Sequence, residues 1–167
     1  HHAYRGGLLD HTLEVADFCD AICDVKDCLR RDFLITGALL HDIGKIDEME
    51  HGLTAGEYQA AGNLIGHVVL GAQMVVVDAA AIENFPGELL DGIVHLILSH
   101  HGQAEFGAAR QPACAEAHTL SQCDLLSARL DQCQQAKNGA TPEQHSVYIK
   151  SLGHCHVGDF ALNHSPF

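Results

Sequence analysis

Five apolar segments with the spacing of amphipathic helices each carry histidine or aspartate side chains inside the apolar pattern. Burying such a group costs several kcal/mol unless it is hydrogen-bonded, paired with a charge or bound to a metal. One such histidine is most often a satisfied core residue, but polar groups that recur on five helices favour a shared polar centre. The residues concerned are His11, His41, Asp42, His67, His100, His101 and Asp124.

The apolar spacing predicts that most of the chain is helical. The predicted helices cover residues 8–25, 32–44, 58–82, 88–101 and 114–136. Asp32 is a favourable N-cap, Gly44 is placed to end the second helix, and Pro86 separates the third helix from the fourth. The polar, glycine-containing stretches 47–57 and 102–113 are predicted loops.

The expected fold class is therefore all-α, a helical bundle that forms a single domain over residues 1–167. No repeat, low-complexity tract or linker divides the chain. We expect a core of about residues 8–136 and a short irregular or extended C-terminal tail of about residues 137–167, where β-branched and aromatic residues recur.

The charge balance limits the possible partners. Nine Lys and Arg residues stand against 22 Asp and Glu residues, which gives a formal net charge of −13. This balance argues against a broad basic nucleic-acid surface. A phosphate substrate is still compatible with it, because bound divalent cations can supply positive charge locally.

The cysteines and the apolar runs indicate a cytoplasmic protein. The seven cysteines include no CxxC pair, and their number is odd, so they are interpreted as reduced thiols. The longest apolar stretch, 63–82, is interrupted by His67, Gln73 and Asp78 and is a poor transmembrane span. The sequence opens with no secretory signal, and no membrane partner is expected.

The adjacent pair His41 and Asp42 suits a metal site. Consecutive helical residues project about 100° apart, so His41 can bind one metal while the two oxygens of Asp42 bridge to a second. Imidazole and carboxylate are suitable ligands for Mn, Fe, Co, Ni or Zn. Two metals about 3.5–4 Å apart can clamp a phosphate oxygen. Because the set contains no cysteine, a closed structural zinc site is not favoured.

These motifs resemble a known family. His11, the His41–Asp42 pair and Asp124 follow the H…HD…D signature of HD-domain metal-dependent phosphohydrolases, and "HDIGK" at 41–45 is similar to the HDIG subgroup with two metals. The segments "HHAYRGGLLDHTLEVA", "ITGALLHDIGKI", "GHVVLG" and "HLILSHHGQAEFG" resemble the HD domain of the YhaM family of 3′→5′ exoribonucleases over roughly residues 1–131.

The resemblance implies a ligand set and roles. Metal one would take His11, His41, Asp42 and Asp124, and metal two would take Asp42, His67, His100 and His101. The expected cofactors are two divalent ions, with Mn²⁺ favoured and Fe, Co, Ni, Zn or Mg as alternatives. Asp42 would be catalytic as the bridging ligand, and Lys45 would be catalytic by offsetting charge on the phosphate. The alternative for Lys45 is a helix-terminal lysine that complements the helix dipole.

Other charged residues are candidates for substrate binding beside Lys45. They border the predicted site, and the alternative for each is a solvated surface charge. They are Arg5, Glu105, Arg110 and Arg129.

The implied function is a metal-dependent phosphodiesterase, similar to a 3′→5′ exoribonuclease that releases nucleoside monophosphates from single-stranded RNA. Family members carry an upstream OB-fold domain that captures single strands, so a separate nucleic-acid-binding domain or partner protein is expected. The run "SQCDLLSAR" at 121–129 departs from the family pattern around the last Asp. One alternative is a phosphohydrolase of nucleotides or cyclic nucleotides, and another is a di-iron HD-domain oxygenase.

Overall fold

The computed structural model describes residues 6–48 and 64–158. The chain divides into two compact units, one comprising His2–Ser127 and the other beginning at Ala128. The helices of the first unit are α1 (Gly7–Cys23), α2 (Arg31–Leu40), α3 (Lys45–Glu48), α5 (His67–Ala80), α6 (Gly87–Ser99), the short 3₁₀ helix η1 (Ala104–Phe106) and the first half of α7 (Ala115–Gly139). The all-α fold class is confirmed, while the single-domain organisation stays a prediction.

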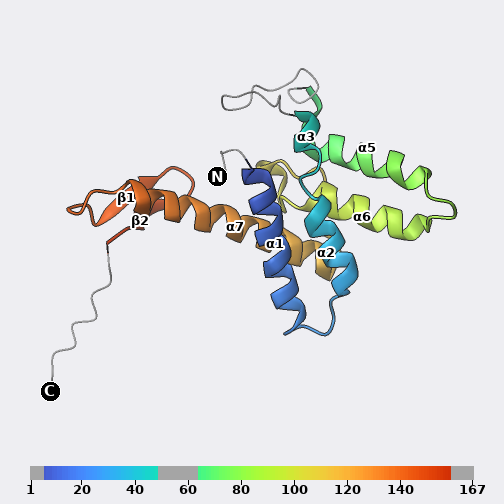
Figure 1. Ribbon diagram of the computed structural model, residues 1–167, viewed down its shortest axis with the longest axis horizontal. Coiled ribbons are helices and arrows are strands. Elements are labelled where there is room, and N and C mark those ends of the chain that lie inside the picture. Colours follow the sequence, from blue (N-terminus) through green and yellow to red (C-terminus); the bar gives the residue numbers. More distant parts are fainter. Residues whose placement is uncertain (1–5, 49–63, 159–167) are drawn as a thin grey trace. The chain divides into compact units, whose positions relative to one another are not determined.

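The helices of the first unit pair in space (Figure 1). α1 lies beside α2, α5 lies beside α6, and α2 also packs on α6. The central cluster contains Val15, Cys19, Leu34, Leu96 and Leu120, all fully buried. Val15 and Cys19 are separated by one helical turn, so the face of α1 that carries them packs on this core. This cluster joins α1, α2, α6 and α7, and a second buried cluster of Ala72, Ile93 and Ile97 joins α5 to α6.

Two predictions about α2 are wrong. The residue at the N-cap is Arg30 in an extended conformation, not Asp32, which lies within the first turn of the helix. Asp32 still complements the positive end of the helix dipole. The helix ends at Leu40, earlier than the predicted end at Gly44, and tight turns follow in which Ile43 N–H donates to Leu40 O and Lys45 N–H donates to Asp42 O.

Gly44 has a different role from the predicted helix stop. A Cβ atom at this position would lie 2.0 Å from the carbonyl oxygen of His67 and 2.5 Å from the backbone nitrogen of Gly71. Contacts this short do not occur, so only glycine fits between the turn and α5. The turn that carries Asp42 is thereby held directly against the first turn of α5.

The predicted helix over 58–82 is interrupted at Gly66, because Leu64 and Ile65 are helical and a new helix starts after the glycine. α5 begins at His67, because Gly66 adopts φ 80° and ψ 150°, a backbone conformation that breaks a helix. Residues 58–63 lie outside the described residues. The predicted loop 47–57 is wrong at its start, where Asp47 and Glu48 belong to the short helix α3, and residues 49–57 also lie outside the described residues.

The second unit contains the end of α7 and a β-hairpin. α7 continues to Gly139, three residues beyond the predicted end at 136. Strands β1 (Ser146–Ile149) and β2 (Gly153–His156) are antiparallel, with Ser146 opposite His156 and Ile149 opposite Gly153. The expected extended conformation of the tail is confirmed for this part.

Among the described residues, no helix combines the length and apolar character required to span a bilayer.

Candidate metal centre

The predicted ligands come together in two groups within the first unit. His11, His41 and Asp124 form one group, and His67, His100 and His101 form the other; in each group the ligand atoms lie within 4.8 Å of one another. We call these the first and the second group. Each is a set of donors that could hold a metal ion, and all six side chains come from helices that are distant in sequence or from the residues just after them.

Asp42 lies between the two groups. Its Oδ2 atom is 3.6 Å from Nε2 of His11 and 3.4 Å from Nε2 of His41 in the first group. Its Oδ1 atom is 3.4 Å from Nε2 of His67 and 3.6 Å from Nε2 of His100 in the second group. One carboxylate therefore presents one oxygen to each group, as expected for a bridging ligand.

Asp124 also contacts both groups. Its Oδ1 atom is 3.2 Å from Nε2 of His11, and its Oδ2 atom is 3.7 Å from Nδ1 of His101. The resemblance assigns Asp124 to metal one alone. The shorter distance agrees with that assignment. The longer one shows that Asp124 of α7 also lies beside His101 of the second group.

Two histidines are oriented by main-chain carbonyls. The Nδ1–H group of His41 donates to Ala38 O at 2.7 Å, and that of His100 donates to Ile97 O at 2.7 Å. Both residues directly follow a helix, so the carbonyl three residues earlier is within reach of the ring. With the proton on Nδ1, the lone pair of Nε2 faces the site, which is the tautomer that binds a metal.

Side chains orient two further histidines. His67 donates from Nδ1 to Glu48 Oε2 at 3.0 Å. His11 pairs through Nδ1 with Ser127 Oγ at 2.9 Å, and the Ser127 hydroxyl donates to Glu14 Oε2 at 2.5 Å. Because this hydroxyl proton is directed to Glu14, Ser127 accepts the proton of His11. Nε2 of both histidines is again left to face the site.

Neighbouring charges outweigh burial in setting the pKa values of Asp42 and His41. Burial raises the pKa of the Asp42 carboxyl, but His41 and Lys45 outweigh this effect and hold the pKa well below its ordinary value. Burial lowers the pKa of the His41 imidazole, whereas Asp42 and Asp124 more than compensate and raise it. Asp42 is therefore ionised, the form in which a carboxylate binds a metal.

Burial keeps two histidines of the second group, His67 and His100, from gaining a proton. Burial, together with the imidazoles of His41 and His101, lowers the pKa of His100 to about 3. Burial also lowers the pKa of His67, against the opposing effect of Asp42. Neutral imidazole is the form that binds metals, so the lone pair of His100 is available across the physiological pH range, and the lowered pKa of His67 favours the same form.

Several contacts in the site suit a bound cation. Nε2 of His41 faces Nε2 of His11 at 3.2 Å, and Nε2 of His67 faces Nε2 of His101 at 3.1 Å. Facing lone pairs repel unless a proton or a cation lies between them. Within the described part of the chain, Asp42 Oδ1 and His100 Nε2 are also buried without a hydrogen-bond partner. Such atoms are costly to bury, and coordination to a metal would satisfy them. The residues present thus fit a divalent metal.

Lys45 lies at the edge of the site. Its ammonium group is 2.5 Å from Asp42 Oδ2, and its side chain is about one-fifth exposed. It follows Asp42 by three residues across the turn, so the two side chains meet on one side. Lys45 therefore pairs with the Asp42 carboxylate and is partly open to solvent.

The other predicted substrate residues are not brought into the site. Glu105 is exposed in η1, and Arg110 is exposed in the following loop, where its backbone N–H donates to Leu98 O. Arg129 is exposed in the unit that begins at Ala128. Arg5 lies outside the described residues. Their substrate-binding roles stay predictions.

The sequence reasoning missed Glu48, Ser127 and Glu14. Two of them carried a usable signal, because Glu14 follows His11 by three residues and Ser127 follows Asp124 by three, so each shares a helix face with a predicted ligand. Glu48 carried no such signal, since it lies in a polar stretch that was predicted as a loop.

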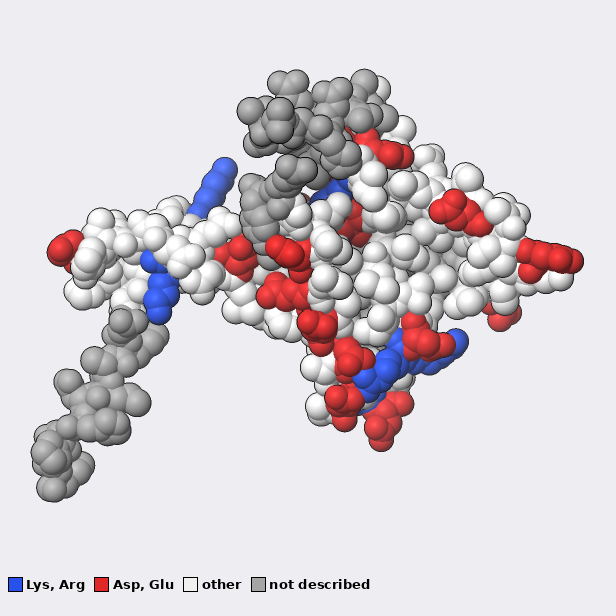
Figure 2. Space-filling model, viewed as in Figure 1, with Lys and Arg blue, Asp and Glu red and all other residues white. Residues whose placement is uncertain are grey.

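Charges on the visible face of the protein are mostly acidic (Figure 2). Arg31 pairs with Asp20 and Asp24, and Arg30 lies 3.7 Å from Asp32, near the turn between α1 and α2. These arginines are thus largely neutralised. Among the described residues, they do not form the basic surface that nucleic acids prefer.

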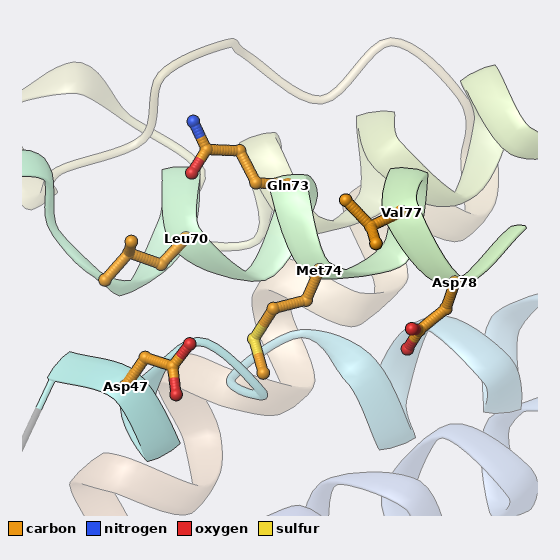
Figure 3. A pocket seen from close by; sticks show the side chains of 6 residues that line it. All are labelled: Asp47, Leu70, Gln73, Met74, Val77 and Asp78. Atoms are coloured by element: carbon orange, nitrogen blue, oxygen red, sulfur yellow. The ribbon is translucent and has the colours of Figure 1, made fainter. Parts of the chain in front are cut away.

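A separate hollow lies between α3 and α5 (Figure 3). Its volume is about 300 Å³, and it is lined by Asp47, Leu70, Gln73, Met74, Val77 and Asp78. The lining includes no predicted metal ligand. Asp47 faces this hollow, while the next residue, Glu48, contacts His67. Adjacent side chains of α3 therefore point in different directions, Asp47 to the hollow and Glu48 to His67.

Comparison with known proteins places the chain among relatives of one kind. It is 33% identical over 152 residues to the 3′-5′ exoribonuclease YhaM of Bacillus subtilis (strain 168), which covers 91% of this chain and 48% of the relative. It is 34% identical over 154 residues to the protein of the same name from Bacillus pumilus (strain SAFR-032), with the same coverage. The chain thus spans about half the length of these curated relatives.

No solved structure matches the chain significantly. The HD domain family matches residues 8–129, a range that contains all seven predicted metal ligands. The resemblance recognised in the sequence is therefore confirmed, and the chain belongs to the HD domain family.

Proposed function

We propose that this protein is a metal-dependent phosphodiesterase with two divalent metal ions, acting as a 3′→5′ exoribonuclease that releases nucleoside monophosphates. The observation that carries the proposal is the position of Asp42, whose two oxygens each face a different group of histidines. A mononuclear site needs no carboxylate placed in this way.

The side chains of the site would have distinct tasks. His11, His41 and Asp124 would hold one ion, His67, His100 and His101 would hold the other, and Asp42 would join them. Such a pair of ions, when bound, activates water as a nucleophile and stabilises charge on the phosphate. The carbonyl and carboxylate acceptors behind the histidines keep the rings oriented, so little reorganisation is needed when substrate arrives.

Relatives named as exoribonucleases support RNA as the substrate. The acidic composition and the paired arginines favour a second candidate, hydrolysis of nucleotides or cyclic nucleotides, which need no extended basic groove. The RNA proposal therefore includes a nucleic-acid-binding domain or partner protein that supplies the grip on the strand. A cytoplasmic location is part of the same proposal.

A product assay with defined metals tests the function. We expect metal-stripped protein to be inactive, and Mn²⁺ to restore stepwise 3′→5′ shortening of an oligoribonucleotide with release of nucleoside 5′-monophosphates. Fe²⁺, Co²⁺, Ni²⁺, Zn²⁺ and Mg²⁺ are compared in parallel, together with DNA, nucleotides and cyclic nucleotides. Hydrolysis of nucleotides without action on any oligomer would favour the second candidate. Turnover that requires iron and oxygen would replace both with an oxygenase.

Lys45 has a testable role of its own. We expect Lys45→Met to lower turnover by about 10²–10³-fold, the usual effect of losing one group that stabilises developing charge. Metal affinity should be unchanged or higher, because Lys45 no longer competes for Asp42 Oδ2. Turnover and metal titration are measured in parallel with Lys26→Met, an exposed lysine between α1 and α2. Unchanged turnover in Lys45→Met would contradict the phosphate role.

A further inference from the structure

Glu48 is only 8% exposed, which is unusual for a residue that carries a carboxylate. Its Oε1 atom accepts the backbone N–H of His67 at 3.1 Å, and its Oε2 atom accepts the ring Nδ1–H of the same residue at 3.0 Å. Both oxygens of one carboxylate are therefore directed at one histidine. Glu48 contacts none of the predicted ligand atoms that face the site, so its action on the site must pass through His67.

The contact to the backbone has a structural reason. His67 is the first residue of α5, and the N-cap Gly66 has no side chain to accept the unpaired N–H groups of the first turn. Glu48 supplies that acceptor from α3, and its negative charge suits the positive end of the helix dipole. The start of α5 is thus fixed in position by Glu48.

The contact to the ring determines the chemistry of His67. A carboxylate on Nδ1–H keeps the proton on that nitrogen and raises the basicity of Nε2. Nε2 of His67 is the atom that faces His101 at 3.1 Å and Asp42 Oδ1 at 3.4 Å. Glu48 therefore both aims and strengthens one donor of the second group.

The first group has a different support. His11 is oriented by a neutral hydroxyl, Ser127, which in turn donates to Glu14. The two groups thus depend on separate outer residues on separate elements, α3 for the second group and α7 with α1 for the first. This separation means that one metal position can be weakened without the other.

We propose that Glu48 is a positioning residue that sets the affinity of the second metal position, while Ser127 sets that of the first. This inference rests on the proposed two-metal function, because it assigns a separate outer support to each ion. In the intact protein, Glu48 and Ser127 hold their histidines in the metal-binding tautomer before any ion arrives.

Matched substitutions test this assignment. Glu48→Gln preserves size, but its amide offers one acceptor and one donor, so it cannot accept both N–H groups of His67. We expect the affinity for one of two Mn²⁺ ions to fall about 10–100-fold, the usual cost of losing such a support. Affinity for the other ion should be unchanged. Asp47→Asn is the control, because this neighbouring carboxylate faces the hollow between α3 and α5.

The double variant separates the two positions. Mn²⁺ binding is followed by calorimetry, and the spin coupling between neighbouring Mn²⁺ ions by electron paramagnetic resonance. We expect Glu48→Gln and Ser127→Ala each to leave one tight ion without spin coupling, and Glu48→Gln/Ser127→Ala to leave none. If the double variant still binds one ion tightly, both residues act on the same position and the assignment is wrong.

Two further outcomes distinguish the inference from the function on which it rests. A wild-type protein that binds one ion and shows no spin coupling would overturn the two-metal function. If the wild-type protein binds two coupled ions and Glu48→Gln also binds two ions with the same affinities, only the role of Glu48 is overturned.

Far-UV circular dichroism checks the fold. If Glu48→Gln is unfolded, Glu48→Asp is measured, because it keeps the charge but reaches only one N–H group and should weaken the same ion.

Discussion

The Asp42→Asn variant is expected to lose both metal ions and its hydrolytic activity together. Asp42 Oδ1 and Oδ2 lie 3.4–3.6 Å from histidine nitrogens of both groups, so its charge serves each metal position. The amide keeps the volume of the side chain but carries no charge and only one acceptor oxygen. The loss should exceed the roughly 10–100-fold that removal of an outer support costs.

Thermal stability gives a readout of this variant that is independent of activity. A ligand that binds only the folded state adds about 2.7 kcal/mol per site at a free concentration 100-fold above its Kd. We expect Mn²⁺ to raise the Tm of the wild-type protein and to leave that of Asp42→Asn unchanged. Asp32→Asn, at an exposed position of α2, should respond like the wild type. A metal-dependent rise of equal size in Asp42→Asn would contradict the bridging role.

The convergence of the seven predicted ligands could be foreseen because each stands out against its surroundings. His11, His67 and Asp124 interrupt apolar helical patterns, where a polar side chain must find a partner. Once the helices pack together, the partners available to these residues are mostly one another. The sequence therefore predicted which residues meet, although their binding of metal stays a prediction.

The outer supports and the local backbone were less predictable. Whether Glu48 is solvated or buried depends on how α3 packs against α5, and no local pattern encodes that contact. The end of α2 was misplaced for a related reason: "HDIGK" has ordinary helical residues on both sides of its glycine, yet the chain turns after Leu40. The packing of Gly44 against α5, not local helix propensity, accounts for the turn.

Gly44→Ala should therefore be among the most destabilising small substitutions in this chain. The added Cβ would meet the carbonyl oxygen of His67 at 2.0 Å and the nitrogen of Gly71 at 2.5 Å, both backbone atoms that cannot move aside cheaply. Overpacking typically costs about 1–3 kcal/mol, and a rigid neighbour favours the upper end, so we expect a fall in Tm of about 6–12 °C. Gly87→Ala, where no atom lies within 4 Å of the added Cβ, is the matched control.

The same substitution should also act on the metal centre, because the turn and α5 carry residues of the same site. Separating them moves Asp42 away from His67, whose nitrogen lies 3.4 Å from Asp42 Oδ1, and should weaken the second metal position more than the first. Mn²⁺ titration of the folded fraction at low temperature measures this effect apart from unfolding. If Gly44→Ala keeps both Tm and Mn²⁺ affinity, the close approach of the turn to α5 is not a feature of the protein in solution. If Tm falls while both ions bind normally, Gly44 supports the fold without setting the distance between Asp42 and His67.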